Sequence, residues 1–188
     1  MAVNRSGKLI IIAAPSGAGK TSIIKRFLET HPNMVHSISW TTRPARPGGV
    51  DEGYYKIVDK KVFEDGISKG FFAEWAEVHG HLYGTPLAPL EEALRDGKDI
   101  LLDLDVKGSL RLKDIYKDQA VTIFVMPPSI DELKRRLSAR ATDSLAAQAL
   151  RIRNALAEIE ERDKFDYCVI NDELEKVCFD IEKIVLEK

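Results

Sequence analysis

The strongest chemical signal in this sequence is a glycine-rich segment at residues 14–21. Its members are Ala14, Pro15, Ser16, Gly17, Ala18, Gly19, Lys20 and Thr21. Glycines at this spacing let main-chain N–H groups converge on phosphate oxygens, and a following helix adds the positive end of its dipole. Lys20 can bridge the β- and γ-phosphates of a nucleoside triphosphate, and the Thr21 hydroxyl can coordinate Mg²⁺. Ala14 replaces the usual first glycine, which fits if φ there is negative.

Two carboxylates at the end of an apolar run form the second candidate group. Asp103 and Asp105 are separated by one residue, so they face the same side of an extended chain. In α/β proteins ligands bind at the carboxyl ends of the parallel strands. One aspartate can hold the water shell of Mg²⁺, and the other can orient a basic group or a second substrate. Helix capping or turn formation is the alternative interpretation.

Arginines form the third group. They are Arg43 and Arg46 in a proline-rich loop, and Arg136, Arg140 and Arg151 in or beside charged segments. Phosphoryl transfer spreads negative charge over several oxygens, and arginine forks neutralise and position that charge. For Arg140 and Arg151 an exposed helix surface is the alternative.

Alternating strands and helices are predicted to position these groups. Apolar runs predict buried strands at 9–14, 99–105, 120–126 and 165–171, and helices are expected at 19–30, 86–96, 106–116, 144–162 and near the C-terminus. This order indicates an α/β fold with a mostly parallel sheet covered on both faces. Residues 36–85 break the rhythm, with strands at 35–42, 54–58 and 71–78 around a helix at 59–69. They predict an inserted subdomain.

The composition narrows the class of protein. The chain has 188 residues, 44% of them apolar, which suits one domain with a sizeable core. A net charge of −2 argues against a general nucleic-acid binder, and no apolar run approaches the ~20 residues of a membrane span. Without a targeting segment we expect the cytoplasm, and in that reducing compartment Cys168 and Cys178 are expected to be buried thiols. Nothing in the sequence indicates the oligomeric state.

Several separated motifs together resemble the guanylate kinases, which transfer the γ-phosphoryl group of ATP to GMP. They are APSGAGKT, SISWTTRPARPG, GYY, EWAEVHGHLYGT, ILLDLDVKG and VIND, and the similarity runs over residues 9–188. The resemblance implies an α/β fold of the P-loop NTPase type in a single domain, 1–188. Its core would comprise 1–35 and 97–188, with a GMP-binding insertion at about 36–96 and a helical lid at about 136–156.

The resemblance also implies roles for individual residues. ATP, with Mg²⁺, would be bound by residues 14–21 together with Arg136, Arg140 and Asn171. GMP would be bound by Ser39, Arg43, Arg46, Tyr55, Glu74, Tyr83, Thr85 and Asp105. The catalytic residues would be Lys20, Arg43, Arg140, Arg151 and Asp103, and the metal would be held by Thr21 and Asp103. Gly49, where these enzymes often carry Glu, and Leu82, where Tyr is common, depart from the pattern, as does a less charged segment at 144–149.

Guanine recognition by Glu74 and Thr85 also follows from their chemistry. One carboxylate can accept both the N1–H and N2–H donors of guanine, and a hydroxyl can donate to O6, whereas adenine presents the reverse pattern. We therefore expect direct in-line transfer from ATP to GMP, and also to dGMP. Two alternatives remain: a non-catalytic guanylate-kinase-like module that binds proteins, and a P-loop kinase for another phosphorylated small molecule. The His79–His81 pair alone indicates no metal site.

Overall fold

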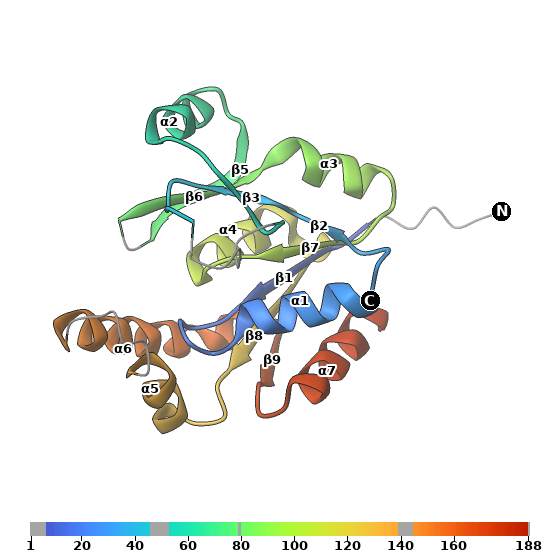
Figure 1. Ribbon diagram of the computed structural model, residues 1–188. Coiled ribbons are helices and arrows are strands. Elements are labelled where there is room, and N and C mark those ends of the chain that lie inside the picture. Colours follow the sequence, from blue (N-terminus) through green and yellow to red (C-terminus); the bar gives the residue numbers. More distant parts are fainter. Residues whose placement is uncertain (1–6, 46–52, 79, 139–144, 188) are drawn as a thin grey trace.

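The core of the computed structural model is a five-stranded sheet in which every pairing is parallel (Figure 1). Its strand order is β2 (Val35–His36), β7 (Ile100–Asp103), β1 (Leu9–Ala13), β8 (Ala120–Met126) and β9 (Tyr167–Ile170). The structure describes residues 7–45, 53–78, 80–138 and 145–187. The predicted α/β class and parallel sheet are confirmed.

Side chains alternate between the two faces of this sheet, and helices cover both faces. Ile10 and Ile12 pack in one cluster with residues of α1 (Lys20–Thr30) and α7 (Leu174–Leu186). Leu9 and Ile11 pack in another with residues of α3 (Leu87–Arg95) and α4 (Val106–Tyr116). Because β1 is buried on both faces, its sequence is an unbroken run of apolar residues.

A second, four-stranded sheet is inserted between β2 and α3. Its order is β4 (Tyr55–Ile57), β3 (Ser39–Thr41), β6 (His81–Pro86) and β5 (Phe72–Val78). The β3–β4 pair is parallel, while β6 runs antiparallel to both β3 and β5. In Figure 1 this sheet and α2 (Lys60–Ser68) lie above the β2–β7 end of the core sheet.

The insertion differs from the sequence-based expectation in two ways. The predicted strand at 35–42 is two strands, because the chain leaves the core sheet after His36 and enters the second sheet at Ser39. Strand β6 was not predicted. Its Gly84 has no room for a side chain, because a Cβ there would lie 2.8 Å from the Phe72 ring and 2.9 Å from that of Phe63.

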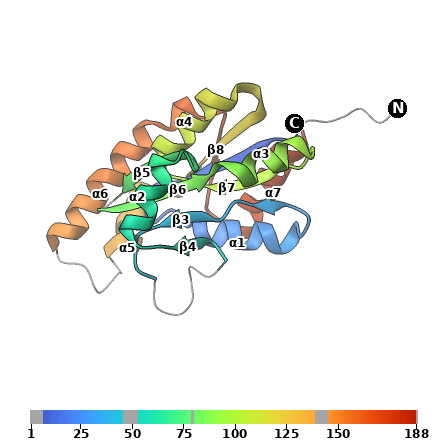
Figure 2. The same ribbon diagram turned by 90° about the horizontal axis from the view of Figure 1, so that it is seen from above.

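Helices α5 (Ile130–Ser138) and α6 (Leu145–Glu160) pack together, and both contribute to an apolar cluster that contains Phe124 of β8. Figure 2 shows α6 passing beside α4, and residues of all three helices share one apolar cluster with Phe124 and Phe165.

One of the two cysteines is not buried as expected. Cys178 is buried, but Cys168 is exposed because it lies on the edge strand β9.

Among the described residues, no helix combines the length and the apolar character that crossing a membrane requires.

Candidate functional site

The phosphate loop occupies the turn between β1 and α1. Gly17 and Gly19 have φ values of 88° and 96°, a region that residues with a Cβ rarely adopt. Within the described residues, the main-chain N–H groups of Gly17, Gly19, Lys20 and Thr21 have no hydrogen-bond partner. Four donors at a helix N-terminus make an anion site. Ala14 is tolerated, because its φ is not positive.

Side chains from the last third of the chain hold this loop from outside. The Asn171 amide donates to the carbonyl oxygen of Ala18 at 2.6 Å, and Arg136 reaches the same oxygen at 3.5 Å. Glu132 orients the guanidinium of Arg136 through a 2.7 Å hydrogen bond. A Cβ on Gly19 would lie 2.5 Å from the Asn171 nitrogen, so close packing as well as φ requires glycine there.

Lys20 joins the loop to the carboxyl end of β7. Its ammonium group lies 2.6 Å from Oδ1 of Asp103 and also donates to the carbonyl oxygen of Leu104. Oδ1 of Asp103 is buried without a hydrogen bond of acceptable geometry, so this contact is a charge contact rather than a directed hydrogen bond. The other carboxylate oxygen accepts from the Tyr55 hydroxyl at 3.2 Å. Asp103 therefore links the phosphate loop to the insertion.

The chemistry of Asp103 and Thr21 fits Mg²⁺ in a nucleotide complex. Both side chains carry hard oxygen atoms, and Oδ1 of Asp103 is buried and accepts no hydrogen bond, although it contacts the Lys20 ammonium. A search of the described residues finds no group of three or more His, Cys, Asp or Glu side chains placed to hold a metal. Mg²⁺ commonly binds one or two carboxylates together with substrate phosphates, so this sparse set suits it.

A second polar cluster lies on the insertion. Nε of Arg43 donates to the Tyr83 hydroxyl at 2.9 Å, and its guanidinium lies 5.7 Å from the centre of the Tyr55 ring. The two tyrosine rings meet edge to face at 6.0 Å, and Ser39 lies buried on the neighbouring strand β3. One cation and three hydroxyls can receive a phosphate group. Arg46, Arg140 and His79 lie outside the described residues, as does Gly49.

Glu74 and Thr85 form a buried pair on adjacent strands of the insertion. Antiparallel pairing places them opposite each other, and the Thr85 hydroxyl donates to Oε1 of Glu74 at 2.7 Å. Glu74 is 5% exposed and Thr85 fully buried. Burial raises the pKa of Glu74 to about 7, although the hydrogen bond from Thr85 acts in the opposite direction.

Helix α4 of the core approaches the Glu74 carboxylate closely. A Cβ on Gly108 would lie 2.8 Å from Oε2 of Glu74, so glycine at this position allows the approach. Asp105 caps the same helix, with Oδ1 accepting from the Gly108 N–H at 2.7 Å. The carboxylate of Asp105 therefore serves as a helix cap in the free protein, and like that of Glu74 it lies close to Gly108.

Sequence analysis missed one carboxylate of the site, Glu158. It lies on α6 and accepts a 3.3 Å hydrogen bond from the main-chain N–H of Ser16 in the phosphate loop. Burial raises its pKa, and the charges of Lys20 and Asp105 also act on it. No local motif marks Glu158, because its partner is 142 residues away. Arg151, half-buried, precedes it by two turns on the same helix.

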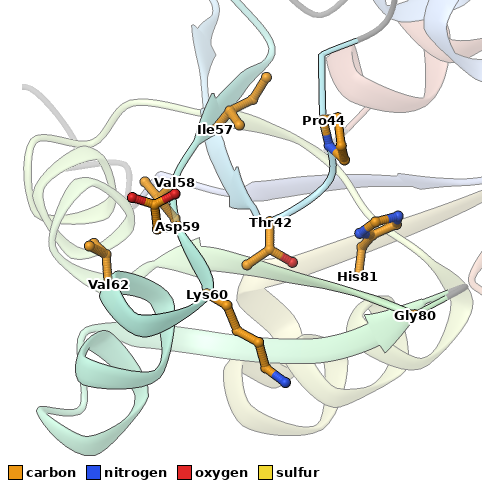
Figure 3. A pocket seen from close by; sticks show the side chains of 9 residues that line it. All are labelled: Thr42, Pro44, Ile57, Val58, Asp59, Lys60, Val62, Gly80 and His81. Atoms are coloured by element: carbon orange, nitrogen blue, oxygen red, sulfur yellow. The ribbon is translucent and has the colours of Figure 1, made fainter.

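A groove of about 650 Å³ opens elsewhere on the insertion. It is lined by the end of β4, the start of α2 and the β5–β6 turn, with Asp59, Lys60 and His81 among its polar side chains (Figure 3). None of the predicted site residues that the structure describes lines it. The groove is therefore distinct from the candidate site.

Comparisons with known proteins find one family over nearly the whole chain. The family model described as guanylate kinase matches residues 6–188. The chain is 46% identical over 184 residues to the guanylate kinase of Syntrophotalea carbinolica, covering 98% of this chain and 87% of that protein. It is 46% identical over 170 residues to that of Sphingopyxis alaskensis, covering 90% and 77%. A crystal structure of guanylate kinase from Anaplasma phagocytophilum superposes with a TM-score of 0.81 at 31% identity, covering 97% of this chain and 86% of that one.

Proposed function

The chain belongs to the guanylate kinase family, whose activity is the ATP-dependent phosphorylation of GMP to GDP, and we propose how its residues perform this reaction. ATP binds the phosphate loop, GMP binds the insertion, and the γ-phosphoryl group passes directly between them. No covalent intermediate on the protein is required, because positioning and charge neutralisation supply the catalysis. The insertion at about 36–96 is the GMP-binding part of a single domain, and residues 136–156 form its lid.

One observation carries the acceptor assignment: the buried carboxylate of Glu74 beside the hydroxyl of Thr85. The carboxylate accepts from N1–H and N2–H of guanine, and the hydroxyl donates to O6. Adenine would place its unprotonated N1 against the carboxylate, which leaves a buried acceptor without a donor. The 2′-position of the ribose plays no part in this recognition, so dGMP is also a substrate.

Binding of guanine exchanges the hydrogen bonds of the Glu74–Thr85 pair. A hydroxyl carries one hydrogen, and in the free protein Thr85 donates it to Glu74. When guanine supplies two donors to the carboxylate, that hydrogen becomes available for O6. The buried charge of Glu74 is thus satisfied best when guanine is present, and this difference gives the pocket its selectivity.

Residues on the two sides of the reacting phosphates hold and neutralise charge. Lys20 leaves Asp103 to contact the β- and γ-phosphates, while the free N–H groups of the loop hold the phosphate oxygens. Arg43 and Arg46 hold the GMP phosphate with Ser39, Tyr55 and Tyr83. Arg140 and Arg151 neutralise the transferred group, and Arg136 and Asn171 bind ATP as well as holding the loop.

We expect the reaction to use Mg²⁺ with ATP, and Thr21 and Asp103 would hold the ion. It would supply charge neutralisation for the phosphates of ATP. The contribution of this chain is to keep Oδ1 of Asp103 buried and available at the end of β7. Retention of Lys20, Thr21 and Asp103 together favours an enzyme over a non-catalytic module.

An acceptor screen tests the proposal. Purified protein with Mg·ATP is offered GMP, dGMP, AMP and ribose 5-phosphate, and ADP formation is followed by a coupled assay. We expect turnover with GMP and dGMP and little with the other two. Equal rates with AMP would refute the role of Glu74 and Thr85, and no ADP with any acceptor would favour the non-catalytic module.

A further inference from the structure

The contact between Glu158 and the phosphate loop is unusual in its chemistry. A loop that binds phosphate offers main-chain N–H groups to anions, and here a carboxylate of the protein already accepts one of them, at Ser16. Glu158 is half-buried, so its negative charge is held at this position rather than left in solvent. A carboxylate at this position would compete with ATP, unless the N–H group that it binds is not one of those that bind phosphate.

The hydrogen bonds of the loop show that the Ser16 N–H is not one of those groups. The Ala18 N–H turns back to the Pro15 carbonyl at 3.0 Å, and the Ser16 N–H goes to Glu158. Of the four donors without partners in the described structure, that of Gly17 lies within the turn, and those of Gly19, Lys20 and Thr21 follow it. Glu158 therefore accepts from the Ser16 N–H and leaves the four donors without partners available for phosphate.

The same contact fixes a helix that carries a site arginine. Glu158 lies seven positions after Arg151, which is close to two full helical turns, so both lie on one face of α6. Ala155 lies between them on that face and is fully buried in the cluster shared with α4 and α5. The position of Arg151 along and around the helix axis is thus determined by packing at Ala155 and by the hydrogen bond at Glu158.

We propose that Glu158 is a positioning residue for phosphoryl transfer, which holds the Ser16 N–H and thereby sets the phosphate loop and Arg151 in register. This inference rests on the proposed function, in which Arg151 neutralises the transferred group. Glu158 does not touch the reacting atoms. It acts through the loop that holds ATP on one side and through α6 on the other.

Two variants and a matched control test this inference. Glu158→Ala removes the acceptor and should lower kcat with GMP by about 10- to 100-fold, with KM for GMP changed less than threefold, because the insertion is not involved. Glu158→Gln keeps an oxygen that accepts from Ser16 and should retain at least about a third of kcat. Glu160→Ala changes an exposed carboxylate on the same helix and should have no effect.

A double-mutant cycle with Arg151→Ala separates positioning from simple stability. If Glu158 acts through Arg151, then Glu158→Ala should cost less than about threefold in kcat once Arg151 is already removed. Fully additive losses, equal losses in Gln and Ala variants, or tighter ATP binding in Glu158→Ala would each overturn the inference. Thermal unfolding of every variant identifies a kcat loss that comes from misfolding, which would also overturn it.

These outcomes are distinct from failure of the proposed function. If the unmodified protein phosphorylates GMP and Lys20→Ala abolishes turnover, the proposed function stands whatever the Glu158 variants show. Normal kcat in Glu158→Ala would then refute the positioning role alone. Absence of GMP kinase activity in the unmodified protein would refute the proposed function itself.

Discussion

Replacing Glu74 with glutamine should stabilise the free protein in neutral and mildly alkaline solution, although it removes the selective acceptor for guanine. Glu74 is 5% exposed, and burial raises its pKa to about 7. A carboxyl group with a raised pKa stabilises the folded state while it is protonated, and this contribution is lost as pH rises through about 7. Glutamine is neutral at every pH and keeps an oxygen that accepts from Thr85.

The size of the effect follows from the two pKa values. The ordinary pKa of the group is 4.5, and the rise to about 7 corresponds to roughly 3 kcal/mol at about 1.4 kcal/mol for each pH unit. About 2.5 kcal/mol of this loss of stability develops between pH 5 and pH 8, because ionisation begins near pH 4.5 in the unfolded chain and near pH 7 in the folded protein. As pH rises across this range, the free energy of unfolding of the Gln variant should therefore increase relative to that of the unmodified protein.

Urea unfolding at pH 5, 6, 7 and 8 measures this gain directly. Glu77→Gln provides the control, because Glu77 lies on the same strand but is exposed, so it makes the same substitution outside the buried site. If the curves for the unmodified protein and Glu74→Gln run parallel over the same range, Glu74 does not ionise in a buried site. Selection of guanine by a buried, ionised Glu74 would then be refuted as well.

Four further predictions concern the reaction itself. Because GMP requires ionised Glu74, its apparent Kd should rise about tenfold from pH 8 to pH 6. Calorimetry measures this rise, with Glu74→Gln correcting for titration of the GMP phosphate. Lys20→Ala should lower kcat by at least about 100-fold with little loss of stability, and near-normal turnover would contradict its role. Thr85→Val should raise KM for GMP by about 5- to 100-fold, since it removes a donor to O6 and to Glu74, and an unchanged GMP-to-AMP preference would argue against that donor. Removing Mg²⁺ with EDTA should abolish turnover but leave GMP binding within about twofold, and loss of both would indicate that the metal supports the insertion.

The parts of the site that could be predicted from sequence are those whose determinants are consecutive. The phosphate loop needs only a strand, glycines at two positions and a following helix, and the positive φ values of Gly17 and Gly19 confirm the conformation. Alternation was expected to bring Asp103 and Asp105 to one side of a strand at 99–105, but β7 ends at Asp103, and Asp105 lies beyond it as the cap of α4. Alternation could not divide their roles, since the ion pair with Lys20 and the cap on α4 depend on neighbours outside the strand.

The parts that could not be predicted depend on pairing between distant segments. Strand β6 contains Gly84 and Pro86, which argue against a strand locally, and it exists because β3 and β5 pair with it on either side. The hydrogen bond between Glu74 and Thr85 follows from that same register. Glu158 resembles any other helix carboxylate in the sequence, and only the packing of α6 places it at the phosphate loop.

The conformation of the phosphate loop is therefore a property of the whole fold as well as of its own glycines. Glycine adopts positive φ at little cost but adopts many other conformations as well, so the surroundings of Gly17 and Gly19 must select this one. Here those surroundings are the Ala18 carbonyl held by Asn171 and Arg136, and the Ser16 N–H held by Glu158. All three side chains follow β8 in the chain, whereas the loop follows β1, so the anion site is complete only after the last strands and helices have packed. Under the proposed function, α5 and α6 would thus contribute to ATP binding through the main chain of the loop, in addition to any arginine that they bring to the substrate.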